Sequence, residues 1–150
     1  MEDELTDDPE TDVRPIARRS DGLPRRLTSV PPSPDEAAAL EVARRIVELA
    51  EDKKAADIVL LGLRELTTLA DYFVVCSGGS ERQLGAIADG IVEGLRAEGV
   101  RPIGREGQST SHWMLLDFGS VIVHIFSQPE RDFYQLEKYW SAARTILRVQ

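Results

Sequence analysis

Cysteine, histidine and aromatic residues are scarce in this 150-residue chain, which has one cysteine, two histidines and 6% aromatic side chains. The single cysteine, Cys76, excludes an intramolecular disulfide and a thiolate metal cluster within one chain, so packing must supply the stability. The chain also lacks a run of about 18 apolar residues that could cross a bilayer. Its acidic start, MEDELTDDPE, does not resemble a signal peptide. We therefore expect a cytoplasmic protein that is not attached to a membrane.

Basic residues are outnumbered by acidic ones: the chain has 18 Lys and Arg and 26 Asp and Glu, which gives a net charge of −8. Proteins that bind nucleic acid gain affinity by placing Lys and Arg against phosphates, so we expect little direct RNA binding. Residues 1–33 contribute a net charge of −3, and the remainder, with 13 basic and 18 acidic side chains, contributes −5. An acidic domain suits a basic protein partner better than a nucleic acid.

Residues 1–33 differ in composition from the rest of the chain. They combine the acidic block, scattered arginines and the proline-rich end VPPSP with few large apolar side chains. Such a segment buries too little apolar surface to offset the entropy of ordering it. The sequence therefore predicts a disordered tail over residues 1–33 and one folded domain over residues 34–150.

Capping and periodicity predict the elements of that domain. A serine cap at Ser33, followed by Pro34, predicts a helix to about residue 52, and a capping box of Ser80 and Gln83 predicts a second helix that ends at Gly99. Strands are predicted at residues 57–63 and 71–76, with a short edge strand at 100–105. A third cap at Ser127 predicts a final helix with an apolar stripe of Phe133, Leu136, Trp140, Ala143 and Leu147.

This order of elements predicts an α/β fold: a single domain with a mixed β-sheet of about five strands flanked by helices. The glycines of the second helix, Gly85, Gly90 and Gly94, each weaken it by up to about 1 kcal/mol. We therefore expect close packing against the sheet to compensate.

The stretch HWMLLDFGSVIVHIF, residues 112–126, predicts an antiparallel hairpin with a two-residue turn at Gly119-Ser120. Phe118 then pairs with Val121, and the register runs back to Trp113 with Phe126. Alternation separates two faces of this hairpin. The first is wholly apolar and consists of Met114, Leu116, Phe118, Val121, Val123 and Ile125. The second consists of Trp113, Leu115, Asp117, Ile122, His124 and Phe126, and we call it the hairpin face.

Two interpretations of the hairpin face stay open on pattern alone. A second layer of helices would bury it and make the sheet a middle layer. Alternatively, it is a recognition surface, which the acid Asp117 and the imidazole of His124 favour because a dry core rarely contains them. An apolar patch rimmed by polar groups typically marks an interaction site.

Catalytic motifs are weak in this sequence. The turn at residues 77–80, SGGS, precedes a helix as phosphate-binding turns do, and nucleotidyltransferases begin their active sites in a similar way. The P-loop and GxGxxG spacings are absent. Nucleotidyltransferases hold magnesium with two acids on a following strand, whereas here Asp71 precedes the turn and Asp117 stands alone at a hairpin. His112 and His124 lack metal-ligand spacing, and Cys76 has no evident activating base. We predict no catalytic, cofactor or metal site and keep a nucleotidyltransferase-like enzyme as the alternative.

Several motifs together resemble those of the ribosomal silencing factor family, RsfS, also called Iojap. The resemblance covers about residues 36–143 without a large gap. The residues that carry it are DYFVV at 71–75, SGGSERQ at 77–83, AIAD at 86–89, EG at 106–107, WMLLDFG at 113–119, VHIF at 123–126 and RDFYQLEKYW at 131–140.

The resemblance implies a non-enzymatic factor that binds the large ribosomal subunit through ribosomal protein fourteen. Subunit joining would then be blocked and translation repressed under starvation or in stationary phase. It also implies a fold similar to the nucleotidyltransferase superfamily, and interface roles for Trp113, Asp117 and Tyr134. The expected partner-binding residues are therefore Trp113, Leu115, Asp117, Ile122, His124, Phe126, Arg131 and Tyr134. A homodimer through the same face is a further possibility for the free protein.

Overall fold

A computed structural model of the chain describes residues 34–64 and 66–150. The predicted disordered tail and the Ser33 cap lie outside these residues. The helices are α1 (Pro34–Asp52), α2 (Glu81–Ala97), α3 (Gln128–Tyr134) and α4 (Leu136–Tyr139), with a 3-10 turn, η1, at Ser109–Ser111. The strands are β1 (Ala56–Gly62), β2 (Tyr72–Gly78), β3 (Gly104–Glu106), β4 (Trp113–Asp117), β5 (Val121–Ser127) and β6 (Arg144–Val149).

All six strands form one sheet in the order β3-β4-β5-β2-β1-β6. The central pair, β2 and β5, is parallel, and the other pairs are antiparallel. The predicted single α/β domain with a mixed sheet is thus confirmed, with one strand more than expected. The edge strand predicted at residues 100–105 pairs only from Gly104 onward.

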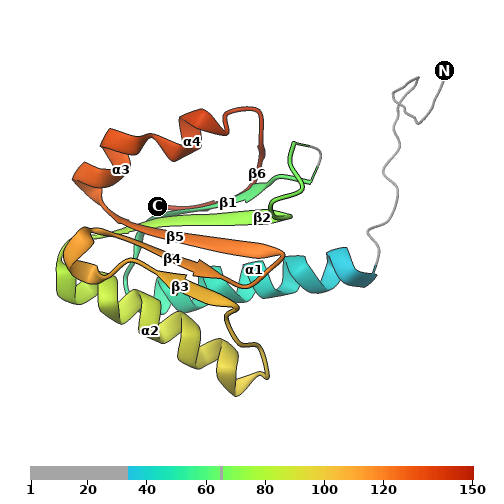
Figure 1. Ribbon diagram of the computed structural model, residues 1–150, viewed down its shortest axis with the longest axis horizontal. Helices are drawn as coiled ribbons and strands as arrows, with labels where there is room; N and C mark the ends of the chain where they lie inside the picture. Colours follow the sequence, from blue (N-terminus) through green and yellow to red (C-terminus); the bar gives the residue numbers. More distant parts are fainter. Residues whose placement is uncertain (1–33, 65) are drawn as a thin grey trace. The chain divides into compact units, whose positions relative to one another are not determined.

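The first core lies between the sheet and the helices α1 and α2, which Figure 1 shows on one side of the strands. The apolar face of the hairpin points into this core, as predicted, with Met114, Leu116, Val123 and Ile125 buried. Gly94 is where α2 approaches α1, because a Cβ there would lie 2.4 Å from Leu49 Cδ2. This glycine therefore allows close packing of two helices rather than the helix–sheet packing that the sequence suggested.

A second core lies on the opposite face of the sheet, where Figure 1 places α3 and α4. Phe73, Val75, Ile122 and Phe126 are buried in it, and Trp140 packs against them. The sheet is therefore covered on both faces over its central strands. This is the arrangement expected when a parallel strand pair lies at the centre of a sheet.

The single final helix predicted after Ser127 is wrong, although the serine cap itself is confirmed, with Ser127 Oγ accepting from the Glu130 N–H at 3.4 Å. Gln135 adopts the left-handed conformation (φ 48°, ψ 49°) and separates α3 from α4. The chain then turns back, and β6 pairs with β1. Pairing with an otherwise open sheet edge satisfies a row of backbone groups, which outweighs a helical apolar period.

The capping of α2 is confirmed in one half only. Ser80 Oγ accepts from the backbone N–H of Gln83 at 3.1 Å, as predicted. The side chain of Gln83 does not return to Ser80. Its oxygen accepts from the Gly79 N–H at 2.6 Å, and its amide nitrogen donates to the carbonyls of Lys53 and Lys54. Gln83 thereby joins the start of α2 to the end of α1.

Candidate partner-binding face

The β4–β5 hairpin has the register predicted from the sequence, from Asp117 opposite Ile122 to Trp113 opposite Phe126. Its turn begins at Gly119, whose φ of 86° favours glycine. Asp117 has a local role here, because its Oδ1 accepts from the Gly119 N–H at 2.8 Å. The carboxylate that marked the hairpin face as polar therefore also stabilises the turn.

Trp113 is the centre of an aromatic cluster that joins the hairpin to α3. Its indole stacks on Phe126, with ring centroids 5.0 Å apart, and lies 4.7 Å from the ring of Tyr134. Trp113 is half-buried, and the side chain of Tyr134 is 47% exposed. We call these two neighbouring, solvent-accessible rings the Trp113–Tyr134 platform.

His124 lies beneath this platform as a neutral core residue. Its Nδ1 accepts from Trp113 Nε1 at 3.3 Å, which places the ring proton of a neutral imidazole on Nε2. Burial lowers the pKa of His124 from 6.5 to about 4. His124 therefore holds the indole ring from below and is not a charged group offered to a partner.

The structure divides the predicted partner-binding residues into two groups. Trp113, Leu115 and Asp117 are partly exposed, and Tyr134 lies beside Trp113. The other four are buried: Ile122, His124, Phe126 and Arg131. An open recognition surface over the whole hairpin face is therefore wrong, because the α3–α4 segment covers the β5 half and leaves the β4 half accessible.

Phe133 was missed as a surface residue by the sequence analysis, which assigned it to a core-facing stripe. Its side chain is 78% exposed, and its ring meets that of Tyr134 edge-on, with centroids 5.1 Å apart. A partial signal was present in the sequence, since adjacent residues on a helix point about 100° apart and Phe133 and Tyr134 therefore do not share one direction. Phe133 extends the platform along α3.

In the described part of the chain, Asp71 and the SGGS turn of the alternative nucleotide site lie far apart. Asp71 immediately precedes β2, whereas the SGGS turn begins at the other end of this seven-residue strand, about 20 Å away at ~3.3 Å per residue. The Gly79 N–H at the turn already donates to Gln83. Within residues 34–64 and 66–150, no group of three or more His, Cys, Asp or Glu side chains is arranged to hold a metal ion.

Cys76 is also unsuited to nucleophilic chemistry. It is fully buried, and burial raises the pKa of its thiol to about 12, although the charge of Arg131 acts in the opposite direction. At neutral pH the group is therefore a thiol and not a thiolate, which is the reactive form. Cys76 packs in the first core as a small apolar side chain.

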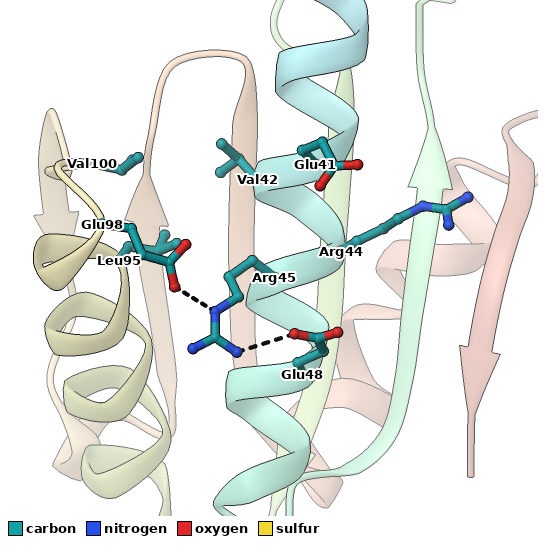
Figure 2. Close-up of a pocket in the computed structure, with 8 residues that line it drawn as sticks. All are labelled: Glu41, Val42, Arg44, Arg45, Glu48, Leu95, Glu98 and Val100. Carbon is teal, nitrogen blue, oxygen red and sulfur yellow. Dashed lines mark hydrogen bonds and ion pairs between the residues drawn. The ribbon is translucent and has the colours of Figure 1, made fainter.

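A shallow hollow of about 260 Å³ lies between α1 and the end of α2. Figure 2 shows Arg45 between two carboxylates there, with Nε donating to Glu98 at 2.6 Å and Nη1 to Glu48 at 3.0 Å. Arg45 is thus already paired on both sides, and the hollow is too small and its lining too polar for a typical ligand pocket. No described helix is both long and apolar enough to cross a bilayer.

Comparison with known proteins adds an independent line of information. A family model described as ribosomal silencing factor during starvation, RsfS, matches residues 36–150. The ribosomal silencing factor RsfS of Halalkalibacterium halodurans is 37% identical over 106 residues, which cover 71% of this chain and 91% of that protein. The RsfS of Bacillus subtilis is 40% identical over 93 residues, covering 62% and 79%.

Related proteins are also found in organelles and among solved structures. The chloroplastic protein Iojap of Arabidopsis thaliana is 31% identical over 112 residues, 75% of this chain and 47% of its own length. A crystal structure of a protein from Chromobacterium violaceum, 35% identical, superposes with a TM-score of 0.67 and covers 69% of this chain and 86% of that one. A structure from Bacillus halodurans, 33% identical, gives a TM-score of 0.62 over 74% and 98%.

Proposed function

Because this chain belongs to the ribosomal silencing factor (RsfS) family, we propose that it binds the large ribosomal subunit and prevents the small subunit from joining it. The proposed contact is ribosomal protein fourteen on the large subunit, and the proposed outcome is repression of translation under starvation or in stationary phase. The proposed place of action is the cytoplasm. The mechanism is steric and needs no catalytic step, cofactor or metal.

The observation that carries this proposal is the Trp113–Tyr134 platform with Phe133 beside it. A contiguous accessible patch of aromatic rings typically marks an interaction site, and aromatic side chains dominate the energetics of protein interfaces. Leu115 and Asp117 adjoin Trp113 on β4 and supply an apolar and an acidic contact. An interface of about 800 Å² per partner, centred on this platform, is enough to occupy a docking surface.

Charge supports a basic protein partner. Residues 34–150 carry a net charge of −5, and the acids Glu130 and Asp132 belong to the same short helix as Tyr134. Opposite charges steer two proteins together and raise the association rate, an effect that salt reduces. The Trp113–Tyr134 platform would then contribute most of the binding affinity, and the surrounding acidic side chains would raise the association rate.

The test is sedimentation of separated ribosomal subunits in a magnesium concentration that allows them to join. We expect saturating wild-type protein to keep the subunits apart and to co-sediment with the large subunit. Trp113→Ala is expected to weaken this binding by at least about 30-fold, equivalent to ~2 kcal/mol. Arg96→Ala, an exposed change on α2, serves as the matched control. Full joining at saturating wild-type protein would refute the proposal.

A second copy of the chain is the other candidate occupant of the platform in the free protein. The same rings that would contact the ribosome are accessible in the isolated chain. Light scattering of the wild type and of Trp113→Ala decides this point. A dimer mass that is unchanged by the substitution would exclude Trp113 as a dimer contact.

A further inference from the structure

Arg131 is the buried residue that ties the α3–α4 segment to the sheet. Its side chain is 4% exposed, and its Nε and Nη2 donate to the two carboxylate oxygens of Glu137, both at 2.8 Å. Nη1 donates to the Asp57 carbonyl at 2.7 Å and to Ser77 Oγ at 2.8 Å. One guanidinium thus connects α3, α4, β1 and β2.

Asp57 extends this network to the last strand. Its carboxylate lies 3.7 Å from Arg131 Nη2 and accepts two hydrogen bonds from Arg148 on β6, at 3.0 and 2.9 Å. Burial acts to lower the pKa of Arg131, but the hydrogen bonds and charge of Glu137, together with Asp57, raise it. The guanidinium therefore stays charged although it is almost wholly buried.

The network surrounds the corner between α3 and α4, which is formed by Tyr134, Gln135 and Leu136. The backbone carbonyl of Arg131 accepts from the Gln135 N–H at 2.9 Å, before the chain enters α4. The side chain of Arg131 then reaches Glu137, beyond the corner. Arg131 consequently holds both sides of the corner on which Tyr134 lies.

Neither helix can hold Tyr134 in place unaided. α3 has seven residues and α4 has four, and isolated helices of that length are not stable in water. Tyr134 faces Trp113 only while the corner keeps its position over β4 and β5. The forked geometry of arginine suits this task, because a lysine offers one point charge and cannot bond Glu137, Asp57 and Ser77 in fixed directions.

We propose that Arg131 is a positioning residue that sets Tyr134 against Trp113 through Glu137, and that it makes no contact with the ribosome. Its effect on ribosome binding rests on the proposed function above. Its effect on the Trp113–Tyr134 contact does not, so the two parts of the proposal are measured separately.

The first experiment measures the platform in the isolated full-length protein. The Trp113 indole N–H donates to His124, and the Tyr134 ring lies 4.7 Å from the indole ring, so loss of the Tyr134 contact shifts the NMR signal of this N–H. Trp140→Phe assigns the signal against the second tryptophan. We expect Arg131→Lys and Glu137→Gln to shift this signal while far-UV circular dichroism still shows folded protein. Arg45→Gln, which removes an arginine that also binds two carboxylates but lies between α1 and α2, outside this network, is the control and is expected to leave the signal in place.

The second experiment measures binding to purified large subunits in a double-mutant cycle. We expect Arg131→Lys to weaken binding about tenfold in the wild-type background and to have little further effect in a Tyr134→Ala background, because it acts through that ring. Glu137→Gln is expected to behave in the same way. Independent, multiplicative losses would show a direct ribosome contact and would overturn the positioning role.

Three further results of these experiments also test the inference. If the Trp113 signal is unmoved in both Arg131→Lys and Glu137→Gln, neither residue positions Tyr134 and the inference is refuted. If both variants lose the whole fold, Arg131 and Glu137 support the fold in general and not Tyr134 in particular, which also refutes it. If the wild type does not bind large subunits while both variants shift the signal, the proposed function fails and the positioning role stands.

Discussion

At the scale of single residues, His124 shows how burial changes the role of an ionisable group. In the sequence it looked like a polar member of an open surface, but in the structure it is a buried acceptor for Trp113 Nε1. Protonation of Nδ1 would remove this acceptor and place a charge in an apolar cluster. The state of His124 is therefore coupled to the orientation of Trp113.

We expect His124 to make stability depend on pH. The pKa of His124 is about 4 in the folded protein, against 6.5 for the unperturbed group. Between these two pH values the unfolded chain binds the proton more readily than the folded protein does. The free energy of unfolding therefore falls as the pH drops from about 6.5 to about 4. Urea unfolding between about pH 7 and about pH 4.5 should show an additional loss of ~2 kcal/mol in the wild type compared with His124→Phe. Parallel curves for the two proteins would contradict this expectation, since His112 and the carboxylates are common to both.

Two glycines of α2 allow a matched test of packing against helix propensity. At Gly94 an added Cβ would collide with Leu49 on α1, whereas at Gly85 the nearest atom, Ser109 Cβ, is 4.0 Å away. We expect Gly85→Ala to stabilise the protein by up to about 1 kcal/mol. Gly94→Ala should destabilise it by ~1–2 kcal/mol, because overpacking outweighs propensity. Thermal unfolding distinguishes the two, and equal stabilisation by both alanines would show that α1 simply moves aside.

At the scale of elements, the C-terminal segment is where sequence and structure disagree most. The spacing of Phe133, Leu136, Trp140, Ala143 and Leu147 satisfies a helical stripe. In the structure, Phe133 lies in α3, Leu136 in α4 and Leu147 in β6, whereas Trp140 and Ala143 lie in the connection between α4 and β6. Two features decide this: the left-handed residue Gln135, and the edge of β1, which only the assembled sheet offers.

Substitutions on β6 separate the strand from the predicted helix. In the strand, Ile146 packs against the first core, and Leu147 is 39% exposed, whereas the helical stripe would bury Leu147. We expect Ile146→Asp to destabilise the protein by ~2–3 kcal/mol, because it buries an unpaired charge beside the core. Leu147→Asp should cost about 1 kcal/mol or less. Chemical denaturation measures both, and the opposite ranking would favour the helix.

The hairpin is the element that sequence reasoning described best. The glycine of its turn and the strict alternation of its strands are local signals, and the observed register agrees pair by pair. What lies on each side of the hairpin is not a local property. Whether Phe126 is covered depends on where α3 lies, and that depends on contacts between residues far apart in the sequence, such as Arg131 with Asp57.

For the molecule as a whole, the association rate depends on where the acidic residues lie as well as on the net charge. If net charge alone steered the protein to its partner, every neutralised acid would have the same effect on the association rate. If the platform is the docking surface, acids near Tyr134 should matter more, because screening limits their influence to about 8–10 Å at moderate salt.

A charge-matched pair of variants tests this. Asp132→Asn on α3 and Glu93→Gln on α2 each remove one negative charge from an exposed site. We expect Asp132→Asn to slow association with large subunits about two- to fivefold at low salt, with little change in the dissociation rate, and Glu93→Gln to have a smaller effect. Stopped-flow measurements over a range of salt concentrations give these rates. An equal slowing in both variants would favour long-range steering without a defined docking site.

Local features could be predicted from the residues alone: the helix starts, the hairpin with its register, the acidic balance and the motifs that identify the ribosomal silencing factor family. These follow from side-chain period, capping chemistry and turn preference, which act between neighbouring residues. The folded molecule was needed to show that Arg131 is an internal anchor, that His124 and Phe126 are covered, and that Trp113 and Tyr134 share one accessible platform. Those outcomes depend on which surfaces meet when helices pack on the two faces of the sheet and β6 pairs with β1, because burial is a property of the assembled molecule.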